Sequence, residues 1–86
     1  MLRISVSVER RDGSREEFPV LPPTIIAFER HAKVGLASAF GGGDAKFEHI
    51  YYLAWLAEKD SGNVVKVFDE WLKNIVDVDV IDSPKG

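Results

Sequence analysis

The histidines are the first residues of this 86-residue chain to consider for chemistry. His31 and His49 are its only histidines, and neither belongs to an H-x-x-x-H or H-E-x-x-H pattern, which brings two imidazoles to one metal ion. We therefore expect both to be structural side chains, at the surface or half-buried.

The glycine run at residues 41–43, followed by Asp44 and Lys46, superficially looks like a phosphate-binding loop that opens a helix. It lacks the spacing G-x-x-x-x-G-K-[ST], and Asp44 puts a negative charge where a phosphate would sit. A flexible break is the expected structure, because three glycines lose much conformational entropy when they are ordered.

Asp77, Asp79 and Asp82 could in principle hold a hard cation, but the pattern lacks the central glycine and the final glutamate of an EF-hand loop. We expect an acidic, solvated edge there instead. Serine and threonine are scarce, and none lies in a nucleophile-elbow pattern. The sequence thus predicts a protein that is not an enzyme and that needs no metal and no cofactor.

The composition is that of an ordinary globular domain, with 45% hydrophobic and 29% charged residues. Eighty-six residues suffice for one domain and not for two. The longest apolar run, residues 50–57, is too short for a membrane span, and the N-terminus has no signal-peptide pattern. With no cysteine, a reducing cytoplasm is the simplest expectation.

The charge balance argues against nucleic acid as a partner. Residues 1–43 carry six basic and five acidic groups, whereas residues 44–86 carry five and nine, which gives a net charge of −3. The one basic cluster, Arg10, Arg11 and Arg15, is interrupted by acidic residues, so it offers no continuous basic face to phosphates. The acidic second half suits solubility or a basic partner.

Local patterns predict an α+β fold, in which a β-hairpin over residues 1–21 precedes a helical part over residues 22–75 and an acidic tail over residues 76–86. Residues 2–8 alternate apolar and polar side chains like a half-buried strand. Asp12-Gly13 is a strong turn signal, and Pro19 suits an edge strand. The returning strand is expected over residues 15–20.

Three helices are expected to pack as a bundle. The first begins at Pro22-Pro23-Thr24, the second covers residues 45–60 after an Asp44 cap, and the third follows Asn63. The third helix has an apolar stripe made of Val64, Val67, Phe68, Trp71, Leu72 and Ile75. Residues 36–40 fit either a helical turn or a loop. Residues 76–82 alternate with period two, and fit either a strand added to the hairpin or an extended, mobile end.

The second helix carries the most informative pattern, because residues 50–57 are apolar or aromatic on every side of two helical turns. Such a helix is normally buried at the centre of a fold, and that is one interpretation. The other is that the side with Tyr52, Trp55 and Leu56 stays exposed as a protein-binding patch, since aromatic residues dominate such anchors.

Several segments, in this order, resemble the tail assembly chaperones of siphophages. Phe28-Glu29-Arg30 and the segment 37–40 resemble that family's first helix and loop. The segment 52–57, with Trp55-Leu56-Ala57, is similar to its Trp-Leu-Ala helix. Val67-Phe68-Asp69-Glu70-Trp71-Leu72 and the acidic stretch after it resemble its closing part. The resemblance covers roughly residues 20–82 and rests on aromatic packing positions.

The resemblance implies a non-catalytic protein of the host cytoplasm that is absent from the mature virion. Such chaperones bind the long helical tape measure protein and help recruit tail tube subunits, mainly through a longer form made by a programmed frameshift. Self-association is compatible with this role. Two other classes stay open: a neck or tail subunit of the virion, and a small inhibitor or regulator that docks on a host protein.

We accordingly expect no nucleic-acid or membrane partner, and a protein-binding site on the second helix. Its contacts are predicted to centre on Tyr51, Tyr52, Trp55 and Leu56, with Phe28 and Trp71 as support or core.

Overall fold

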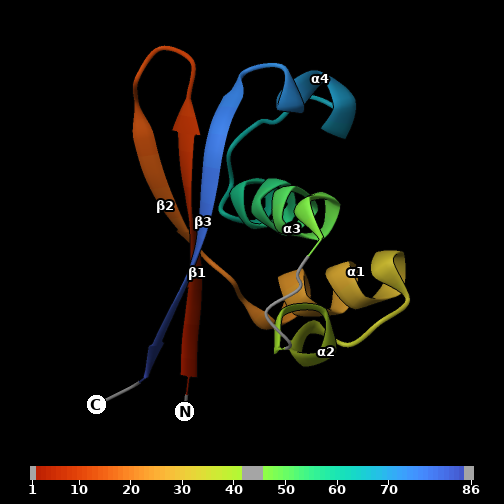
Figure 1. Ribbon diagram of the computed structural model, residues 1–86. Helices are drawn as coiled ribbons and strands as arrows, with labels where there is room; N and C mark the ends of the chain where they lie inside the picture. The colour runs from red at the N-terminus through yellow and green to blue at the C-terminus, as the bar shows by residue number, and fades with distance from the viewer. Residues whose placement is uncertain (1, 42–45, 85–86) are drawn as a thin grey trace.

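The computed structural model describes residues 2–41 and 46–84, which form a three-stranded antiparallel sheet with helices along one side of it (Figure 1). The predicted α+β class is therefore confirmed. In chain order the elements are β1 (Leu2–Arg10), β2 (Arg15–Pro19), α1 (Pro22–Ala32), α2 (Leu36–Gly41), α3 (Phe47–Asp60), α4 (Phe68–Leu72) and β3 (Ile75–Pro84).

The β-hairpin forms where the sequence predicts it. β1 and β2 pair antiparallel, with Val6 opposite Phe18 and Val8 opposite Glu16. Gly13 has φ +90°, a backbone conformation that glycine adopts without strain. Hydrogen bonds from Ser14 hold the pKa of Asp12 below its ordinary value. This local turn chemistry explains why the hairpin could be read from the sequence.

The C-terminal segment is a strand of the sheet, which decides between the two predicted alternatives. β3 pairs antiparallel with β1 along nearly its whole length, so the strand order is β2-β1-β3 and β1 lies in the middle. A register shift occurs where Glu9 faces Asp77 and Arg10 faces Ile75, which leaves Val76 without a partner on β1. Such a bulge bends the strand where the chain enters it.

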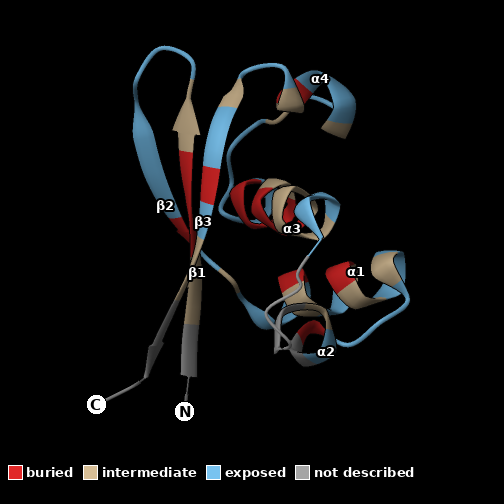
Figure 2. Ribbon diagram, viewed as in Figure 1, coloured by how far each residue is buried: buried red, intermediate tan, exposed pale blue. Residues whose placement is uncertain are grey.

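The core lies between the inner face of the sheet and α3, and α1 packs alongside α3 (Figure 2). Val6 and Val8 of β1 and Leu53 of α3 are completely buried, as is Phe28 of α1. Thr24, also fully buried, donates a hydrogen bond of 2.7 Å to the Asp60 carboxylate and so joins the first turn of α1 to the end of α3. The first two predicted helices are therefore present, and Asp44, the predicted cap of the second, lies outside the described residues.

The prediction of a long third helix is wrong, and so is the prediction of a three-helix bundle. Only Phe68–Leu72 is helical, and residues 63–67 are an irregular connection. Of the predicted apolar stripe, Trp71 is buried, but Val64 is fully exposed and Val67 is 69% exposed. Residues 36–41 form the short helix α2, which settles the alternative left open for that segment.

Two physical causes shorten this helix. Val64, Val65 and Val67 are β-branched, which lowers their helix propensity. At the other end the chain must enter the sheet, because Ile75 pairs with Arg10 and the Asn74 carbonyl accepts a 3.0 Å hydrogen bond from the Arg11 N–H. Pairing with a distant strand thus overrides the local helical period.

Candidate functional site

The side of α3 that faces away from the sheet carries a stripe of aromatic side chains. Leu53, Ala54 and Ala57 point into the core, so the residues on the opposite side of the helix remain accessible. Phe47, Tyr51 and Trp55 follow one another at a spacing of four, which places them in one row on the helix surface. Tyr51 and Trp55 are half-buried, and Phe47 is 76% exposed.

Neighbouring helices extend this stripe on both sides. The His31 ring of α1 stacks on Tyr52 with centroids 3.8 Å apart. The Phe68 ring of α4 lies 5.2 Å from Tyr52 and 5.8 Å from Trp55, in T-shaped contacts. We call the set His31, Phe47, Tyr51, Tyr52, Trp55 and Phe68 the aromatic surface. It joins side chains from α1, α3 and α4, and these three helices lie on the same side of the sheet (Figure 1).

Trp55 is held in a fixed orientation at the centre of the aromatic surface. Its Nε1–H donates a 2.8 Å hydrogen bond to the carbonyl of Lys66, so the irregular connection 63–67 is anchored to α3. The Lys59 ammonium lies 5.2 Å from the centre of the Trp55 ring, at a distance where a cation and a π system attract each other. A fixed aromatic side chain loses little further conformational entropy when a partner covers it.

The structure divides the six predicted site residues into two groups. Tyr51, Tyr52 and Trp55 lie on the aromatic surface and are partly accessible. Leu56, Phe28 and Trp71 are buried. The prediction that Leu56 belongs to the exposed patch is therefore wrong, because Leu56 lies on the side of α3 that packs into the core. Phe28 and Trp71 take the core position that was one of their two predicted alternatives.

Phe47, His31 and Phe68 are the members of the aromatic surface that were not among the predicted site residues. The spacing of Phe47, four residues before Tyr51 and eight before Trp55, could have revealed it. The stacking of His31 on Tyr52 joins two helices, and no local pattern signals it. The other histidine, His49, meets the edge of the Phe28 ring at 5.6 Å.

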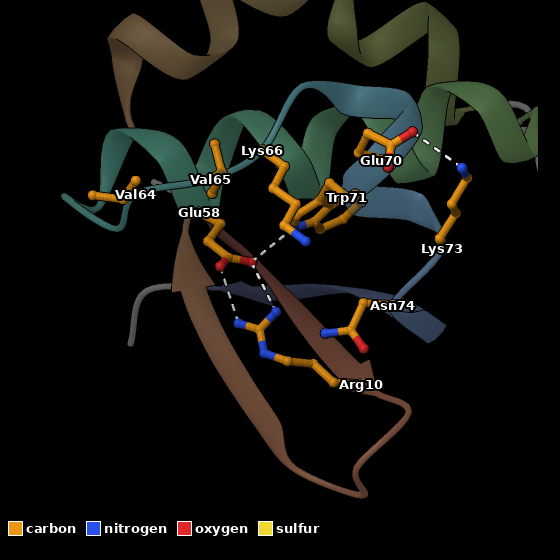
Figure 3. Close-up of a pocket in the computed structure, with 9 residues that line it drawn as sticks. All are labelled: Arg10, Glu58, Val64, Val65, Lys66, Glu70, Trp71, Lys73 and Asn74. Carbon is orange, nitrogen blue, oxygen red and sulfur yellow. Dashed lines mark hydrogen bonds and ion pairs between the residues drawn. The ribbon is translucent and has the colours of Figure 1, made fainter.

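A second feature is a polar pocket of about 430 Å³ where the end of β1 meets the connection before β3 (Figure 3). At its inner wall the buried Glu58 carboxylate accepts hydrogen bonds from the Arg10 guanidinium at 3.1 and 3.3 Å and from the Trp71 indole at 3.2 Å. Asn63 donates a further bond of 3.4 Å to Glu58. These bonds join α3, α4 and β1 at one carboxylate.

Arg10 is fully engaged in this pocket, because its guanidinium also pairs with Glu16 at 2.7 Å. Burial acts to lower the pKa of Arg10, but hydrogen bonds and the negative charges of Glu16 and Glu58 outweigh it and raise that pKa. At the rim Lys73 pairs with Glu70 at 3.0 Å. The charged groups of the inner wall are thus paired with one another, which joins α3 to β1.

The described residues also bear on the metal, phosphate and membrane alternatives considered from the sequence. Among residues 2–41 and 46–84, no group of three or more acidic or histidine side chains could hold a metal ion. Asp77 and Asp79, which were considered as cation ligands, lie 3.9 and 3.4 Å from the Arg15 guanidinium. Most of the glycine-rich loop lies outside the described residues. Within them, no helix has the length and apolar character to cross a membrane.

Comparison with known proteins gives no relative of this chain. No protein-family model matches the sequence, and no curated protein and no solved structure is significantly similar to it. The aromatic surface is therefore the feature on which a functional assignment has to be built.

Proposed function

We propose that this chain is a non-catalytic protein-binding domain that acts as a siphophage tail assembly chaperone, with the tape measure protein as its client. The aromatic surface is the observation that carries the proposal, since it offers preformed aromatic anchors on the outer side of a domain. The resemblance of residues 20–82 to that family supplies the client. Location in the host cytoplasm, and help in recruiting tail tube subunits, belong to the same proposal.

The composition of the aromatic surface suits binding of a polypeptide. Trp and Tyr are enriched among the residues that dominate binding energy, because they bury a large area at a small cost in conformational entropy. Tyr52 and Trp55 lie at the centre, with ring centroids 5.5 Å apart, and other rings surround them. A partner that covers this surface would remove apolar area from water, and each Å² buried contributes about 25 cal/mol of favourable free energy.

The row on α3 further suits a helical client. Phe47, Tyr51 and Trp55 repeat every four residues, and an amphipathic helix presents its own apolar side chains at spacings of three and four. A helix laid along α3 would therefore meet one ring per turn. The tape measure proteins of this family's phages are long and helical, which fits such a row.

The direct test is co-expression with the tape measure protein encoded in the same tail gene cluster. We expect the tape measure protein to remain in the supernatant after centrifugation and to copurify with an affinity-tagged copy of this chain. An unrelated coiled-coil protein of similar length is the control, and it should not copurify. A tape measure protein that precipitates equally with and without this chain would contradict the proposal.

Mass spectrometry of purified virions separates the chaperone from the other classes. A chaperone should be absent from the particle, whereas a neck or tail subunit would be present in many copies. Stoichiometric capture of a host protein, with no effect on the tape measure protein, would instead favour an inhibitor.

A further inference from the structure

The two edges of the sheet differ, and only the β2 edge is blocked against further pairing. β2 has five residues and ends at Pro19, which has no N–H to offer. β3 has ten residues, and its proline is the last of them. A strand of this length with one unpaired side is a template for another strand unless something protects it.

The register shows which backbone groups face the open edge of β3. Val20 donates to the Ile4 carbonyl and Arg10 donates to the Ser14 carbonyl, so the even-numbered residues of β1 direct their backbone groups toward β2. The odd-numbered residues of β1 therefore point toward β3, where Ser7 faces Asp79 and Ser5 faces Ile81.

Because directions alternate along a strand, Val78 and Val80 direct their N–H and C=O groups away from β1. Among the described residues, no loop or helix supplies a backbone hydrogen bond to either of them. The middle of β3 thus offers two donors and two acceptors in the arrangement that an added strand requires.

The charge next to this edge determines the kind of strand that fits. Asp77 and Asp79 are 52% and 62% exposed and lie on the outer face of the sheet, as does Glu9 opposite Asp77. Among the described side chains, Arg15 is the cation that forms ion pairs with these three carboxylates, so one positive charge is shared by Glu9, Asp77 and Asp79. The outer side of the open edge is therefore negative.

A second copy of this chain fits the edge poorly in the two registers that centre on Val78 or on Asp79. Two antiparallel β3 strands centred on Val78 would bring Asp77 of one copy opposite Asp79 of the other, and a shift by one pair would bring the two Asp79 side chains together. Like charges directly opposite each other destabilise a strand pair. Lysine or arginine at the facing positions would be favourable instead.

We propose that the open edge of β3 binds an extended basic segment of a partner protein by strand addition, with Val78 and Val80 supplying the backbone hydrogen bonds and Asp77 and Asp79 pairing with its cationic side chains. This site is separate from the aromatic surface, so the two proposals can fail independently.

A capped nine-residue peptide in which lysine alternates with threonine tests the proposal against the full chain. In the free protein, we expect the amides of Val78 and Val80 to exchange with deuterium faster than those of Asp79 and Ile81. With the peptide at ten times its Kd, exchange at Val78 and Val80 should slow about tenfold, because only the free fraction exchanges. The same peptide with N-methyl groups on alternate residues keeps its charge but cannot pair, and should not bind.

Charge variants test the second half of the proposal. Asp77→Asn with Asp79→Asn should weaken peptide binding about 3- to 10-fold, since each cross-strand ion pair contributes a few tenths of a kcal/mol or more. Glu48→Gln with Asp69→Asn removes the same charge from exposed positions on α3 and α4, and should leave the Kd within about twofold, the effect expected of distant, screened charges.

Three results would overturn the proposal. One is equal binding of the N-methylated peptide, and another is an equal loss in the two charge variants. The third is protection of Val78 and Val80 in the free protein that rises with protein concentration, which would show that a second copy occupies the edge.

Discussion

Glu58 is the residue on which the packing of the connection between α3 and β3 depends. Its carboxylate is buried and accepts hydrogen bonds from Arg10, Trp71 and Asn63. A buried charge is tolerated only when its partners replace the water it has lost. Trp71 lies in α4, shortly before β3, and its side chain is buried in the core. The hydrogen bond to Glu58 therefore also holds the Trp71 side chain in place.

Glu58→Ala should therefore destabilise the protein by about 2–4 kcal/mol, because it leaves the Trp71 indole without an acceptor and Arg10 with only Glu16. Glu16→Gln removes the other partner of Arg10 at a carboxylate that is 51% exposed, and should cost less than about 1 kcal/mol. Urea unfolding of both variants measures the difference. Equal losses would contradict the structural role assigned to Glu58.

At this scale the sequence predicts part of the site. The aromatic run on the second helix contains Tyr51, Tyr52 and Trp55, three members of the aromatic surface, and aromatic residues are frequent anchors of binding sites. Which side of an all-apolar helix faces the core depends on its neighbours, and this is why Leu56 was misplaced. The Arg10–Glu58 pair joins residues 48 positions apart, so no local pattern could reveal it.

Helices and strands could likewise be predicted from the sequence where local signals determine them, and could not where contacts with distant residues do. The hairpin and the helices α1 and α3 carry their own signals, namely Asp12-Gly13, Pro22-Pro23 and the stop at Ser61-Gly62. The third predicted helix fails and β3 was left open because both depend on pairing with β1. Strand pairing across the whole chain is not encoded in a short window of sequence.

The end of α3 offers a prediction at the element scale. Gly62 has φ +97°, and a Cβ added there would meet no atom within 4 Å, so Gly62→Ala tests backbone strain alone. We expect a loss of about 1–2 kcal/mol. Gly35→Ala is the matched control: its φ is not positive and its new Cβ would lie 3.8 Å from Glu29 Oε2. It should be neutral or stabilising by up to about 1 kcal/mol.

Chemical denaturation of the two glycine variants measures how much each substitution changes the free energy of unfolding. If Gly35→Ala costs more than Gly62→Ala, then the left-handed conformation does not explain the stop of α3.

The aromatic surface and the acidic side chains of the sheet lie on different parts of the molecule. The aromatic surface lies on the helical layer, whereas Glu9, Asp77 and Asp79 lie on the outer face of the sheet. A protein that holds an apolar client needs such a division, because charge on the remaining surface keeps the complex from associating further. Under this account, side chains on the helical layer determine client binding, and the sheet provides the rigid support beneath them.

The affinity of the Trp55→Ala variant for the tape measure protein tests this account most directly. Isothermal titration calorimetry should show binding at least about tenfold weaker than that of the unmodified chain, as expected when an aromatic anchor is lost. Phe47→Ala, at a side chain that is 76% exposed, should also weaken binding and leave the melting temperature unchanged. Ile26→Ala removes an apolar side chain that is 47% exposed on the opposite side of α1 from Phe28, and should change nothing. Unchanged affinity in both aromatic variants, or an equal loss in Ile26→Ala, would contradict the aromatic surface as the binding site.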